Sequence, residues 1–174
     1  MLQIIEALWK VCLMRVAPQD LPSSKFLLWA AAGAYALIGS LISLLTLGPI
    51  AAVLSAVVDT GVLLGLTMLV LWIKDTGERY TQTATALAGS GAILMGIALP
   101  LLILQAKLGV DGNTLPSLLV LVLMVWNLNV VGHILRHALD TKFFVGLLLS
   151  VVYLYVSISV FRAFFSQYAT VVAS

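Results

Sequence analysis

The chain has 174 residues, of which 62% are hydrophobic and 9% charged; its formal net charge is +2 and its mean hydropathy +1.14. Soluble domains are about 45–50% apolar and about 25% charged, so this composition excludes a soluble enzyme, a nucleic-acid-binding protein and a disordered chain. The single cysteine, Cys12, excludes an internal disulfide and a zinc site built on thiolates.

Residues 1–17 predict an amphipathic helix that is too short and too charged to span a membrane. At about 100° per residue, Gln3, Glu6 and Lys10 fall on one narrow face and apolar side chains cover most of the remainder. Such a helix lies in the membrane surface or caps a helical bundle, and the sequence leaves both arrangements open. Pro18 and Pro22 are expected to end it.

Five long apolar segments follow, predicted as transmembrane helices at about 26–46, 50–73, 81–104, 117–138 and 143–161. Each approaches or exceeds the ~20 residues that a spanning helix needs, and Gly48–Pro49 marks a turn between the first two. The runs are too long for β-barrel strands and do not alternate. The predicted fold class is all-α: a polytopic membrane protein in which an amphipathic interfacial helix precedes a five-helix transmembrane domain over 26–168.

Lysine and arginine are distributed unevenly between the two sides of this bundle. With five spans, two of these residues lie on one side, Lys107 and Arg162. Cytoplasmic segments carry the excess of basic residues, which predicts a cytoplasmic amino terminus and an external carboxyl terminus. The other seven lie on the side of the amino terminus: Lys10, Arg15, Lys25, Lys74, Arg79, Arg136 and Lys142.

Small residues recur at four-residue spacing in three of the predicted spans. In lipid, such faces let helices approach closely. We expect them to pack within the bundle, and the alternative is that one of them binds another subunit. The stripes are Ala84, Ala88, Ala92 and Gly96 in span three, Ala32, Ala36 and Ser40 in span one, and Gly61 and Gly65 in span two.

Asp59 is the acidic residue deepest in the predicted spans, ~15 Å from the start of span two. A charged aspartate at that depth costs roughly 3 kcal/mol, so Asp59 is expected to be protonated, paired or turned toward the bundle interior. Asn127 lies at similar depth in span four, and Ser90 and Tyr153 reach comparable levels. The sequence predicts a polar layer at the midplane that is either a structural hydrogen-bond network or a proton or ligand site.

A second polar stripe runs along span four toward the cytoplasm. Arg136 and Asp140 are four residues apart and are expected to form an ion pair at the helix end. The stripe consists of Asn129, His133, Arg136, His137 and Asp140.

His133 and His137 have the spacing at which two imidazoles can hold one metal ion. A third ligand would have to come from Asp75 or Glu78 on the same side. Interfacial histidines without a metal are the favoured interpretation, so no metal or other cofactor is predicted. No nucleophile–base pair or phosphate-binding loop is recognisable, and Gly89-Ser90-Gly91 lacks the strand–turn–helix setting of a nucleophile elbow. We do not expect an enzyme.

Three stretches together resemble a known family: Pro18-Gln19-Asp20-Leu21-Pro22, TATALAGSGAILMGIALP in span three and VWNLNVVGHILRHAL in span four. Over about residues 10–165 the chain resembles small bacterial inner-membrane proteins related to the Yip (Rab/Ypt-interacting protein) superfamily. The resemblance implies a five-span protein of the bacterial inner (plasma) membrane. It implies no catalytic residue, and Rab binding is not carried over because the relatives' recognition region has no counterpart here.

Two functions follow as hypotheses. The favoured one is a non-enzymatic organiser or accessory subunit that packs against lipids, other membrane proteins or itself, with no nucleic acid as partner. The alternative is a small transporter or channel that uses Asp59 and the polar face of span four. The organiser predicts a dry bundle with an occupied small-residue face, whereas the transporter predicts a water-filled cavity that reaches Asp59. The lack of a visible internal duplication disfavours a carrier built from inverted repeats.

Overall fold

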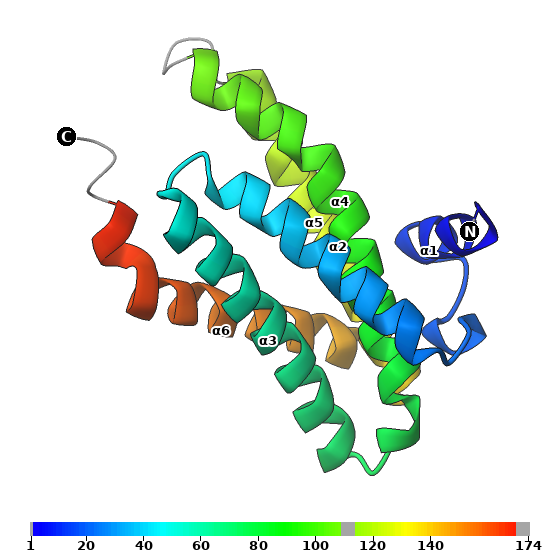
Figure 1. Cartoon of the computed structure of the whole chain (residues 1–174). Coiled ribbons are helices and arrows are strands. Elements are labelled where there is room, and N and C mark those ends of the chain that lie inside the picture. The colour runs from blue at the N-terminus through cyan, green and yellow to red at the C-terminus, as the bar shows by residue number, and fades with distance from the viewer. Residues whose placement is uncertain (1, 109–113, 170–174) are drawn as a thin grey trace.

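The computed structural model describes residues 2–108 and 114–169. The helices are α1 (Leu2–Cys12), α2 (Lys25–Ser43), α3 (Pro49–Ile73), α4 (Tyr80–Leu108), α5 (Thr114–Ala138) and α6 (Phe143–Ala169), with short 3₁₀ turns η1 (Pro18–Asp20) and η2 (Gly77–Arg79) (Figure 1). Five of them are long and apolar enough to cross a membrane. The all-α, polytopic fold predicted from the sequence is therefore confirmed.

The helix bounds differ from the predicted ones near Gly48, beside residues 109–113 and at the end of α6, which continues to Ala169 and not to residue 161. α2 ends at Ser43 because the last turn before Gly48 tightens, with the amides of Thr46 and Leu47 both donating to the Ser43 carbonyl. α4 continues through Pro100 to Leu108 and α5 begins at Thr114, so both are longer than predicted. Proline is tolerated inside membrane helices because neighbouring groups satisfy the freed carbonyl.

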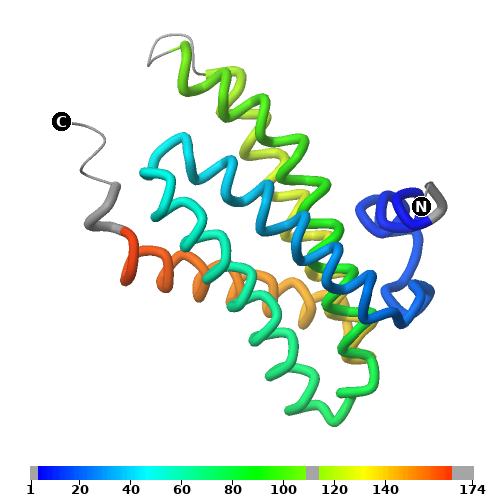
Figure 2. The backbone as a smooth tube through the Cα atoms, viewed as in Figure 1, coloured from blue at the N-terminus to red at the C-terminus, as the bar shows by residue number. Residues whose placement is uncertain are grey.

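α4 lies at the centre of the bundle, in contact with α1, α2, α3 and α5. α4 and α5 run side by side along their length, whereas α6 crosses the bundle beside α3 (Figure 2). The α2–α3 hairpin covers α4 on one side, and α5 joins α6 on the other. This arrangement brings α2, α3 and α6 together near the middle of the bundle.

The small-residue face of α4 packs within the chain. Ala84 and Ala88 are fully buried, and a Cβ added at Gly91 would lie 2.7 Å from Cε2 of Tyr35 in α2. By contrast, Gly61 and Gly65 of α3 are exposed, and an added Cβ would meet nothing within 4 Å. The same kind of pattern therefore forms an internal contact in α4 and an open surface in α3.

The amphipathic α1 packs against the bundle, as the cap arrangement requires. Val11 and Cys12 are fully buried, and the opposite face carries an exposed ion pair between Glu6 and Lys10 (2.8 Å). The indole Nε1 of Trp126 in α5 donates to the Cys12 carbonyl (2.9 Å). Burial raises the pKa of the Cys12 thiol to about 11. The placement of α1 in the membrane surface stays a prediction.

Candidate functional site

Asp59 joins three helices at the middle of the bundle. The hydroxyl of Tyr35 in α2 donates to Oδ2 of Asp59 (2.7 Å), and the hydroxyl of Ser157 in α6 donates to Oδ1 (2.8 Å). Asp59 is therefore turned toward its neighbours, as its depth in the sequence predicted. We call Tyr35, Asp59 and Ser157 the midplane layer.

One cavity, the acid cavity, opens on one side of the midplane layer and has a volume of about 380 Å³. It lies where α2 ends, α3 begins and α6 ends, and Met95 of α4 forms part of its wall. Ser55 donates a hydrogen bond to Ser43 on its lining (3.1 Å). Its polar and charged lining residues are Ser43, Ser55, Asp59, Ser157 and Arg162.

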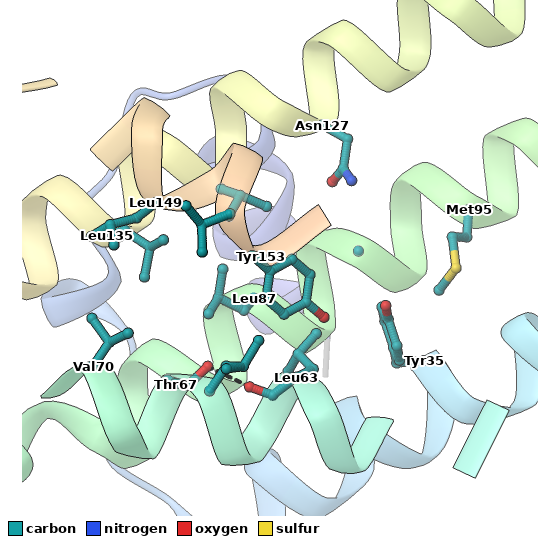
Figure 3. Close-up of a pocket in the computed structure, with 14 residues that line it drawn as sticks. Tyr35, Leu63, Thr67, Val70, Leu87, Met95, Asn127, Leu135, Leu149 and Tyr153 are labelled. Carbon is teal, nitrogen blue, oxygen red and sulfur yellow. Dashed lines mark hydrogen bonds between the residues drawn. The ribbon is translucent and has the colours of Figure 1, made fainter. Parts of the chain in front are cut away.

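A second cavity, the tyrosine cavity, lies on the opposite side of the layer and has a volume of about 110 Å³. It is enclosed mainly by the later half of α3, the middle of α4, α5 and the first half of α6 (Figure 3). Tyr35 lines this cavity while Asp59 lines the acid cavity, and Met95 lines both. The midplane layer thus separates two cavities that are stacked along the bundle.

The charges around Asp59 are few. In the part of the chain that the structure describes, Arg162 is the basic residue on the lining of the acid cavity, and no lysine, arginine or histidine lines the tyrosine cavity. Within the described residues, Asp59 forms no ion pair. Its carboxylate is held by two hydroxyl groups, which can rotate to donate or accept. Asp59 is therefore held by hydrogen bonds from neutral groups and not by an ion pair within the described structure.

Of the other polar residues predicted at the midplane, Tyr153 adjoins this layer, whereas Asn127 and Ser90 do not. Tyr153 lines the tyrosine cavity, and its hydroxyl interacts with those of Tyr35 and Ser157. Asn127 lines the same cavity. Ser90 is fully buried and donates to the Leu87 carbonyl of its own helix (3.3 Å). Asn129, from the polar stripe of α5, donates to the Val125 carbonyl of its own helix (2.8 Å). The prediction of a polar midplane identified Asp59 and the adjoining Tyr153, and it missed Tyr35 and Ser157.

The two histidines of α5 lie against each other and against backbone and side-chain groups nearby. Their ring centroids are 4.6 Å apart, with His133 Nε2 3.3 Å from the Val16 carbonyl oxygen. His137 Nε2 lies 3.1 Å from a guanidinium nitrogen of Arg136. Among the described residues, no three histidine, cysteine or acidic side chains are grouped so that they could hold a metal ion. Asp75 and Glu78 do not supply the third ligand considered above.

The predicted ion pair between Arg136 and Asp140 is wrong. α5 ends at Ala138 and Asp140 adopts a left-handed backbone conformation (φ 48°), so the two residues do not share a helix face. Asp140 instead pairs with Arg79 (2.7 Å), whose guanidinium also donates to the last carbonyls of α5 at His137 and Ala138 (both 3.2 Å). Arg136 lies over the ring of Phe143, 5.6 Å from its centroid.

Comparison with known proteins gives no assignment: no protein-family model, curated protein or solved structure matches this chain.

Proposed function

We propose that this protein is a small proton-coupled membrane carrier in which Asp59 binds and releases the proton. The observation that supports it is the position of Asp59 between two stacked cavities, in a span where an ionisable group is costly. A purely structural layer would need neither cavity. With the orientation predicted from the basic residues, the acid cavity faces the outside and the tyrosine cavity faces the cytoplasm.

The chemistry of the acid cavity favours a proton over a metal cation. Arg162 lines this cavity together with Asp59, and its positive charge opposes a bound metal cation. A protonated Asp59 is neutral and escapes that repulsion. Tyr35 and Ser157 come from different helices, so movement of α6 against the α2–α3 hairpin would change access to the carboxyl group.

The test is proton uptake by proteoliposomes that contain a pH-sensitive dye, driven by a potassium diffusion potential. The parent protein and Asp75→Asn, a matched change at an exposed acid in the α3–α4 connection, are expected to acidify the lumen. Asp59→Asn is expected to fold normally and to reduce the rate to that of protein-free liposomes. Equal rates for the parent and Asp59→Asn would contradict the proposal.

A second candidate function is that of an organiser or accessory subunit, and the exposed Gly61–Gly65 face of α3 favours it. Such small-residue pairs drive close helix contacts in membranes, and this one has no partner within the described part of the chain. In-membrane cross-linking through a cysteine at Leu54, which is exposed nearby on α3, would capture a second copy or another subunit. Gly65→Ile should abolish that cross-link if the face is used.

A further inference from the structure

The tyrosine cavity has a polar end and an apolar end. Figure 3 shows Asn127, Met95 and Tyr35 at one end and Leu135, Leu149 and Val70 at the other, with Tyr153 between them. Among the described residues, no aspartate, glutamate, lysine, arginine or histidine lines it. An occupant of this cavity would therefore meet hydrogen-bonding groups on one side, aliphatic side chains on the other and no charge.

Two of the polar groups that line the cavity face its interior. The Tyr153 hydroxyl is buried and forms no hydrogen bond of normal geometry in the described structure. It points toward Tyr35 across the cavity (Figure 3) and lies close enough to interact with the hydroxyls of Tyr35 and Ser157. The carboxamide of Asn127 also points into the space (Figure 3). The other two hydroxyls are engaged, because Thr67 donates to the Leu63 carbonyl (2.7 Å) and Tyr35 donates to Asp59. A buried hydroxyl that is held only by such imperfect contacts is costly, and a bound acceptor would reduce that cost.

The volume of about 110 Å³ suits a molecule of a few heavy atoms, since a dry cavity of ~150 Å³ admits benzene. Water alone would satisfy the polar end, but it would find no partners at the end formed by Val70, Leu135 and Leu149. We propose that the tyrosine cavity binds a small neutral amphipathic molecule, with a hydroxyl or carbonyl oxygen at Tyr153 and Asn127 and an alkyl body against the aliphatic end. That this molecule is the solute that the protein carries rests on the proposed function. That the cavity binds it can be tested without measuring transport.

The test is photolabelling of the full-length protein in lipid nanodiscs with a butanol-sized alcohol that carries a diazirine on its alkyl chain. We expect saturable labelling of the aliphatic end of the cavity, at Val70, Leu135 and Leu149, as identified by peptide mass spectrometry. Excess butanol should compete with the probe and reduce this labelling. Tyr153→Phe should weaken the apparent affinity about fivefold, the equivalent of one hydrogen bond of ~1 kcal/mol. Tyr155→Phe is the matched control, because this tyrosine lies two residues away on α6 and is 72% exposed.

A second variant tests the same cavity without changing Tyr153. Val131→Phe fills the cavity from α5, so it should abolish the saturable component while the protein stays monodisperse. Labelling that is unsaturable and spread over lipid-facing side chains, or equal affinities for Tyr153→Phe and Tyr155→Phe, would overturn the proposal. If the labelling is not saturable but proton uptake depends on Asp59, the binding-site proposal is wrong and the carrier proposal is retained. If the labelling is saturable but uptake does not depend on Asp59, the carrier proposal is wrong and the binding-site proposal is retained.

Discussion

Replacing Gly91 by alanine tests the contact that positions Tyr35. A Cβ at this position would lie 2.7 Å from Cε2 and 3.0 Å from Cδ2 of the Tyr35 ring. The ring would have to shift, and its hydroxyl would be drawn away from Asp59. Gly61→Ala is the matched control, because its added Cβ would meet nothing within 4 Å.

The expected difference follows from two costs. Forcing a methyl group into a packed contact costs typically ~1–3 kcal/mol, and loss of an interhelical hydrogen bond in a membrane protein costs on average ~0.6 kcal/mol. The gain in helix propensity from glycine to alanine occurs in both variants and cancels. Gly91→Ala should therefore be about 2–3 kcal/mol less stable than Gly61→Ala.

The free energy of unfolding of the two variants can be compared by denaturation with SDS in mixed micelles, followed by circular dichroism. Hydrogen exchange at the Tyr35 segment provides an independent measure of the local disturbance. A difference below about 0.5 kcal/mol would refute the reasoning, because it would mean that Tyr35 does not pack on Gly91.

Three further outcomes are expected. Asp59→Leu should destabilise the bundle by ~0.6–2 kcal/mol relative to Asp59→Asn, which keeps hydrogen bonds to both hydroxyls; SDS denaturation measures the difference. The Cys12 thiol should resist alkylation by maleimide at pH 8 in the folded protein, because its pKa is raised to about 11. The stability that the protonated thiol contributes should be complete below pH 9 and should be lost as the pH rises toward 11. Arg79→Ala should cost about 1 kcal/mol, since it removes hydrogen bonds to the end of α5 from a partly exposed side chain, and thermal unfolding in detergent would detect it.

The sequence was sufficient to predict the five spanning helices, because each needs only a long apolar run. The sequence was less informative about where the helices end, and a small error in a helix end led to a wrongly predicted ion pair. Asp140 was placed on the face of Arg136, but α5 ends at Ala138 and the side chain turns to Arg79.

Contacts between helices were the part that the sequence could not supply. The depth of Asp59 predicted an interior position, but its partners depend on the rotation and tilt of α2 and α6, which hydropathy does not encode. Tyr35 and Ser157 were therefore missed, whereas Asn127 was expected at that level and lines the tyrosine cavity instead.

The central claim is that solvent reaches Asp59 through the acid cavity, and cysteine accessibility tests it most directly. In a Cys12→Ser background, Ser157→Cys places a thiol beside the Asp59 carboxylate. We predict that a charged, membrane-impermeant thiol reagent modifies it from the side of the carboxyl terminus. Ser150→Cys, at a fully buried serine of the same helix, should stay unmodified. If the cysteine at position 157 reacts only after denaturation, the bundle is dry around Asp59 and the carrier proposal is contradicted.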